Sequence, residues 1–120
     1  MIWVLPGFLG QSEDFEVLSE FQYEVIPLFA KNNELSIKIK KQDWVTHFIQ
    51  YVQKQKYKNN ILLGYSFGAR LALEVLKKHS DIFSHCVFIS ANTSNLTDQE
   101  RKARKLNDQK WSESFLHNDW

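Results

Sequence analysis

The chain has 120 residues and a mass of 14.2 kDa, which is enough for one domain at most. Its 15 basic and 14 acidic residues give a net charge of +1, and this balance argues against a binder of nucleic acids or membrane surfaces, because those proteins carry a basic excess. Cys86 is the single cysteine, so a disulfide framework within the chain and a cysteine zinc site are excluded. No signal peptide or membrane-spanning run is present, and we expect a cytoplasmic protein.

In the first half of the chain, apolar runs bounded by polar residues predict strands, and helical spacing of apolar residues predicts helices. The predicted order is a strand over residues 1–5, a short helix from Ser12 or Asp14 to about Phe21, a strand over residues 23–28 and a helix capped by Asp43. Between the last two elements, apolar and polar residues alternate over residues 35–40. This alternation indicates an edge strand or an extended connection.

The second half of the chain continues the alternation of strands and helices. The predicted order is a strand over residues 61–63, a helix over residues 68–78, a strand over residues 85–90 and a charged helix from Thr97 or Asp98 to about Phe115. Strands that alternate with helices at this spacing indicate βαβ units. We therefore predict an α/β fold with a parallel sheet in a three-layer α/β/α arrangement.

Residues 64–68 read Gly-Tyr-Ser-Phe-Gly and form a G-x-S-x-G motif between a predicted strand and a predicted helix. In this context the motif places its serine on a sharp strand-to-helix turn, where a strained backbone exposes the hydroxyl group. Gly64 and Gly68 leave space where strand and helix approach closely. We therefore predict that Ser66 is a catalytic serine; the alternative is an ordinary turn with a serine between two glycines.

A catalytic serine of this kind needs an oxyanion hole made of two backbone N–H groups. The Phe67 N–H, at the start of the predicted helix, is the first candidate donor. The second donor is expected from a loop after an earlier strand, and residues 6–10 (PGFLG) are the candidate loop. In this loop we predict that the Phe8 N–H is the second donor and that Gly7 is the glycine of the oxyanion loop.

Four segments together resemble the N-terminal half of an α/β-hydrolase, and more narrowly the MenH-like 2-succinyl-6-hydroxy-2,4-cyclohexadiene-1-carboxylate synthases of menaquinone biosynthesis. Residues 6–10 are similar to the family's H-G-F-L-G, with Pro6 in place of the histidine, and residues 12–15 (SEDF) are similar to its S-x-x-D-W or S-E-D-W. Residues 64–72 are similar to G-Y-S-[LM]-G-G-R-x-A, and residues 100–111 to E-R-x-x-R-x-x-x-D-x-x-W.

The resemblance implies the remaining site residues and the reaction. It implies that Arg70 and Arg104 bind the carboxylates of a small polycarboxylate substrate and that Tyr65 lines the pocket, which suits the planar two-point fork of arginine. Pyruvate would be eliminated from a cyclohexene substrate, with Ser66 as the triad serine and no metal or organic cofactor. Ester or thioester hydrolysis on the same scaffold is the alternative.

The triad partners of Ser66 are not evident in the sequence. In this fold the acid and the histidine follow the serine on loops after later strands, and His79, His85 and His117 all lie too early for that role. We therefore expect residues 1–120 to be the N-terminal part of a single α/β-hydrolase domain, with local strand order 4-3-5-6 and a helical cap that begins at about residue 97. A missing C-terminal half or a second chain would complete the sheet; an inactive truncated fragment is the third alternative.

Overall fold

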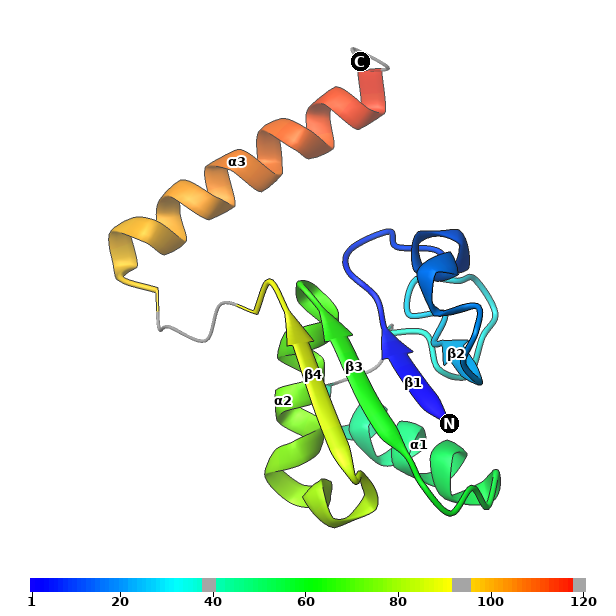
Figure 1. Ribbon diagram of the computed structural model, residues 1–120. Helices are drawn as coiled ribbons and strands as arrows, with labels where there is room; N and C mark the ends of the chain where they lie inside the picture. Colours follow the sequence, from blue (N-terminus) through cyan, green and yellow to red (C-terminus); the bar gives the residue numbers. More distant parts are fainter. Residues whose placement is uncertain (38–40, 92–95, 118–120) are drawn as a thin grey trace.

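The structure is a computed structural model that describes residues 1–37, 41–91 and 96–117. Its centre is a four-stranded sheet with the strand order β2-β1-β3-β4, and every pair of neighbouring strands is parallel (Figure 1). The strands are β1 (Ile2–Leu5), β2 (Tyr23–Val25), β3 (Ile61–Tyr65) and β4 (His85–Ile89). The predicted α/β class, parallel sheet and local strand order are confirmed.

One face of the sheet is covered by the helices α1 (Lys41–Lys54) and α2 (Phe67–His79), as Figure 1 shows. Trp3, Leu5 and Leu62 of the strands are buried against this layer. The rings of Trp44 and Phe48 stack within α1 at a centroid distance of 5.1 Å. Burial of these large apolar side chains is the main stabilising term of the domain, since each contributes roughly 1.5–3 kcal/mol.

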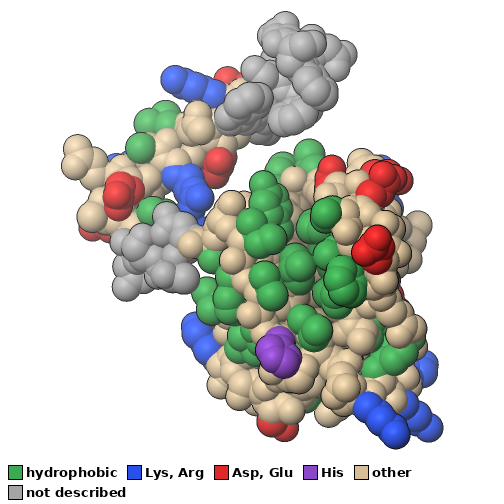
Figure 2. Space-filling view, in the orientation of Figure 1, with side chains coloured by type: hydrophobic (Ala, Val, Ile, Leu, Met, Phe, Trp, Pro, Cys, Tyr) green, Lys and Arg blue, Asp and Glu red, His purple; other side chains and the backbone are tan. Residues whose placement is uncertain are grey.

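The opposite face of the sheet has a smaller cover. Val4 and Leu63 point to this side and pack against Phe15 of the 3-10 helix η1 (Ser12–Leu18). Nearer the β4 edge, Val87 and Ile89 are each 44% exposed, and Figure 2 shows hydrophobic side chains gathered over this face. The described residues therefore form an α/β sheet that is fully covered on one side only.

The last helix, α3 (Asp98–His117), stands clear of the sheet in Figure 1. Its start is a capping box, because the Glu100 N–H donates to Thr97 Oγ1 and the Thr97 N–H donates to Glu100 Oε2. The helix begins close to residue 97, where the helical cap of the hydrolase domain is predicted to start. That α3 belongs to such a helical cap stays a prediction. None of the described helices combines the length and the apolar character needed to cross a bilayer.

The alternation that begins at Leu35 does not form a strand in the described residues, which here end at Ile37. Asn33 Oδ1 accepts a hydrogen bond from the Leu35 N–H at 2.8 Å, and the Leu35 carbonyl accepts one from the Trp44 indole N–H at 2.8 Å. These local bonds satisfy the backbone in a turn instead of a sheet ladder. The rest of the alternating segment, residues 38–40, lies outside the described residues.

Candidate active site

Ser66 lies between β3 and α2 in a backbone conformation that side chains rarely adopt, with φ 52° and ψ −110°. Such a conformation costs of order 1–3 kcal/mol and persists only where the surroundings enforce it. Two neighbouring elements do so here: the Ser66 N–H donates to the Ile89 carbonyl of β4 at 2.9 Å, and the Ser66 carbonyl accepts from the Ala69 N–H of α2 at 3.1 Å. The sharp turn expected from the motif is therefore present at Ser66.

The two glycines of the motif are needed for space. A Cβ atom on Gly64 would lie 2.5 Å from Ala69 Cα, and a Cβ on Gly68 would overlap the Leu5 carbonyl of β1. Neither glycine has a positive φ, because that conformation falls on Ser66. The glycines thus let α2 pack directly against the strands, and this close packing presents Ser66 at the carboxyl ends of β3 and β4.

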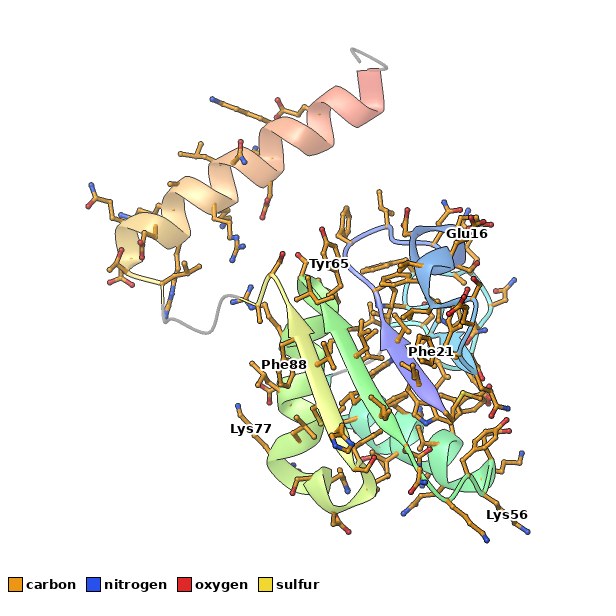
Figure 3. The ribbon with its side chains drawn as sticks, in the orientation of Figure 1. Glu16, Phe21, Lys56, Tyr65, Lys77 and Phe88 are labelled. Atoms are coloured by element: carbon orange, nitrogen blue, oxygen red, sulfur yellow. The ribbon has the colours of Figure 1, made fainter. Side chains whose placement is uncertain are left out.

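The loop after β1 lies beside Ser66. A Cβ atom on Gly7 would lie 3.0 Å from the Tyr65 ring and 3.6 Å from Ser66 Cβ, so the two segments are in close contact. The loop is a tight turn in which the Gly10 N–H donates to the Gly7 carbonyl at 3.0 Å and Leu9 has a φ of 57°. Figure 3 shows Tyr65 at the carboxyl end of β3, next to this loop.

Phe8 follows Gly7 in the loop after β1, and Phe67 follows Ser66 at the start of α2. Their backbone N–H groups therefore lie on the two sides of the contact between Gly7 and Ser66. Within the described part of the chain, neither N–H group has a hydrogen-bond partner. Phe67 is also the first residue of α2, where the helix dipole favours negative charge. Free donors beside a serine can stabilise the oxyanion that forms when the serine attacks a carbonyl carbon. The assignment of these two donors to an oxyanion hole stays a prediction.

Phe29 links the two predicted donor residues, and no motif in the sequence predicts its place there. Its ring packs against Phe8 at a centroid distance of 5.2 Å and against Phe67 at 5.7 Å. Phe29 follows β2, at the same end of the sheet as Ser66, and this place after a predicted strand was the one signal in the sequence. The three rings join the loop after β1 to the start of α2.

Ser66 opens into a cavity of about 640 Å³. Residues 7–10, Tyr65, Ile89 and three residues of η1 complete its lining; the η1 residues are Asp14, Phe15 and Val17. Tyr65 therefore lines the same cavity as Ser66, and its part in substrate binding stays a prediction. Asp14 is a second cavity residue without a predicted role in the site, although it lies in the segment that resembles S-x-x-D-W or S-E-D-W.

The two predicted carboxylate-binding arginines do not line this cavity. Arg70 is exposed on the first turn of α2, and Arg104 lies with Lys110 in a shallow hollow on α3. Their role in substrate binding stays a prediction. Of the histidines, His47 lines another cavity on α1, His79 ends α2 and His85 begins β4. The described residues also contain no group of three or more side chains suited to holding a metal ion.

Comparison with known proteins agrees with this geometry. A family model for the alpha/beta hydrolase fold matches residues 4–119, a span that includes the Ser66 turn, the loop after β1 and α3. No curated protein was found to match the chain.

Proposed function

This chain belongs to the alpha/beta hydrolase fold family, and we propose that its Ser66 is the nucleophile of an enzyme that hydrolyses esters or thioesters. The observation that carries the proposal is the position of Ser66: a strained turn at the start of α2, open to a cavity and next to the N–H groups of Phe8 and Phe67, which have no hydrogen-bond partner among the described residues. A serine placed in this way is typical of nucleophilic catalysis at a carbonyl carbon.

The proposed reaction has two steps. Ser66 Oγ attacks the acyl carbonyl carbon and loses its proton to a base, while the Phe8 and Phe67 N–H groups stabilise the negative oxygen. The carbon–oxygen or carbon–sulfur bond to the leaving group then breaks, and the alcohol or thiol departs with the proton. Water next attacks the acyl-serine, which releases the carboxylic acid and regenerates Ser66.

The base is proposed to be a histidine oriented by an acid, as in other serine triads. Among the described residues that line the cavity there is no histidine. We therefore propose that both partners come from a segment beyond this lining.

A second candidate is the MenH-like elimination of pyruvate, which Arg70 favours. Arg70 lies one helical turn after Ser66, and its backbone N–H donates to the Ser66 carbonyl at 3.4 Å. An exposed guanidinium at this position is suited to binding a substrate carboxylate in a two-point fork. In this reaction Ser66, activated by its base, would remove a proton from the substrate, and Arg104 and Tyr65 would contribute further contacts.

Labelling with a serine-reactive fluorophosphonate tests the role of Ser66. Because the proposed base would take the hydroxyl proton and the two N–H groups would stabilise the oxyanion, Ser66 is expected to react at least about tenfold faster than the exposed Ser12. Peptide mass spectrometry locates the label, and Ser66→Ala is the control. Equal labelling rates at Ser66 and Ser12 in a protein that contains both triad partners would contradict the proposal.

Product analysis separates the two candidate reactions. The hydrolase predicts turnover of short acyl esters, whereas the synthase predicts release of pyruvate that is lost in Arg70→Ala. Lys77→Ala is the matched control, because Lys77 is a cation on the same helix that lies near its other end (Figure 3). Ester turnover without any pyruvate release would exclude the synthase.

A further inference from the structure

The exposed apolar side chains of this protein are concentrated around Ser66. More than half of the exposed large hydrophobic residues in the described chain line the cavity that holds this serine: Phe8, Leu9, Val17, Tyr65 and Ile89. Val17 is 83% exposed and Phe8 is 71% exposed, so their apolar surfaces lose contact with water only when something else covers them. An apolar hollow around a nucleophile is a binding site for an apolar group.

The cavity also carries a negative charge at a defined place. Asp14 is the one acidic or basic residue among the described residues that line it. Asp14 Oδ2 accepts a hydrogen bond from the Gln11 N–H at 2.9 Å, and this capping interaction holds the carboxylate at the start of η1. Asp14 is exposed, and a carboxylate in the wall repels a ligand that carries a second carboxylate close to it.

We propose that the Ser66 cavity selects esters and thioesters with a neutral, apolar acyl group, and that Asp14 rejects acyl groups that carry a carboxylate. The inference rests on the proposed hydrolase function and names its substrate class. The acyl chain would lie along Phe15, Val17 and Ile89, with its carbonyl carbon at Ser66. Selectivity by a repulsive group is a recognised means of excluding wrong substrates.

Two esters with the same leaving group and the same chain length provide the test. p-Nitrophenyl hexanoate is neutral, whereas p-nitrophenyl hydrogen adipate carries a carboxylate at the far end of its acyl chain. We expect kcat/KM for the hexanoate to exceed that for the adipate at least about tenfold, as like-charge repulsion predicts. The rate with Ser66→Ala is subtracted, so that spontaneous hydrolysis does not contribute.

Asp14→Asn assigns the preference to this carboxylate. The asparagine amide oxygen can still accept from the Gln11 N–H, so the cap of η1 is retained while the charge is removed. The ratio between the two esters is expected to fall to about threefold or less. Glu16→Gln is the matched control, because Glu16 is an acid on the same helix outside the cavity lining (Figure 3); its ratio is expected to equal that of the wild type.

A binding measurement distinguishes failure of this inference from failure of the proposed function. The anilide of hexanoic acid and the monoanilide of adipic acid are not readily hydrolysed, and their binding is followed by the backbone amide signals of Gly7 and Ser66 in nuclear magnetic resonance spectra. If a protein that contains both triad partners hydrolyses neither ester, but the neutral anilide binds more tightly than the charged one, the hydrolase proposal fails and the inference about the cavity holds. Equal binding of the two anilides, binding of neither, or an unchanged preference in Asp14→Asn overturns the inference.

Discussion

Ser66 illustrates how a single residue can carry both the strain and the chemistry of a site. Its positive φ is imposed from two sides, by the Ile89 carbonyl of β4 and by the first turn of α2. Local strain of this kind is characteristic of functional positions, where it keeps a reactive group in one orientation. The strain therefore belongs to the folded state, and its release should be measurable as a gain in stability.

Replacing Ser66 by glycine should stabilise the protein. Glycine adopts positive φ without strain, which relieves about 1–3 kcal/mol, and its greater freedom in the unfolded chain offsets about 0.5–1 kcal/mol of this. We expect the free energy of unfolding in urea to rise by about 1 kcal/mol relative to Ser66→Ala, while both variants lose fluorophosphonate labelling. A Ser66→Gly protein less stable than Ser66→Ala would show that the turn is not strained.

Phe29 should act as a positioning residue for the two predicted oxyanion donors. Replacing it by leucine removes the ring that lies between Phe8 and Phe67, so the two N–H groups lose their common support. The rate of Ser66 labelling is expected to fall about tenfold, less than the loss of a whole donor, and Phe29→Tyr should restore it. Phe21→Leu, at an exposed ring elsewhere (Figure 3), is the control. Labelling that is unchanged in Phe29→Leu would argue against this role.

The residues of the site differ in how far the sequence predicts them. Ser66, Gly64 and Gly68 are predictable because the turn is built from neighbours in the chain, and their spacing alone encodes it. Phe29 and Asp14 are not, because each reaches the site only when the strand order brings distant segments to one end of the sheet. Contacts of this kind depend on strand order and are invisible to a local motif.

At the scale of elements, local apolar patterns predict the strands and helices well where tertiary packing agrees with them. The runs before Pro6 and before Ser66 form β1 and β3, and the helix after Ser66 is α2 as expected. The alternating residues from Leu35 to Ile37 form turns, because the Asn33 side chain and the Trp44 indole bind the backbone there. The alternation of apolar and polar residues does not reveal whether side chains will bind the backbone groups that a strand would need.

A hydrogen bond between elements should make stability depend on alkaline pH. Tyr51 of α1 donates to Glu24 Oε1 of β2 at 2.6 Å, and this bond, with partial burial, raises the pKa of Tyr51 from 10.0 to about 12. The neutral phenol is therefore favoured in the folded state. Its contribution to stability is complete below about pH 10 and is lost as the pH rises through about 12.

Glu24→Gln tests this link between α1 and β2. Removal of the accepting carboxylate should lower the pKa of Tyr51 towards its ordinary value, measured by ultraviolet titration of phenolate absorbance with Tyr51→Phe to identify the signal. Glu34→Gln should have a smaller effect, because Glu34 acts on Tyr51 by charge alone, whereas Glu24 also accepts its hydrogen bond. A Tyr51 midpoint that is the same in Glu24→Gln and the wild type would contradict the assignment.

At the scale of the whole molecule, the sheet is unequally covered. The helices α1 and α2 bury one face, whereas Val87 and Ile89 of β4 leave apolar surface exposed on the other (Figure 2). β4 is also an edge strand of the described sheet, paired on one side with β3. Its sequence, HCVFI, contains no lysine or proline of the kind that protects natural edges. Completion of this edge by a further strand, from a second chain or another segment, stays a prediction.

An uncovered apolar edge should promote association between copies of the chain, and Val87→Lys should suppress it. A lysine at the centre of β4 adds charge to the edge and to the exposed face, and both effects oppose pairing with another strand. Because Val87 is already 44% exposed, the free energy of unfolding should change by no more than about 0.5 kcal/mol. We expect light scattering at increasing protein concentration to show less association for Val87→Lys than for the wild type.

Leu106→Lys is the matched control, since Leu106 is 60% exposed but lies on α3, away from the sheet. If Leu106→Lys reduced association as much as Val87→Lys, added charge alone would explain the effect, and the β4 edge would not be the site of contact.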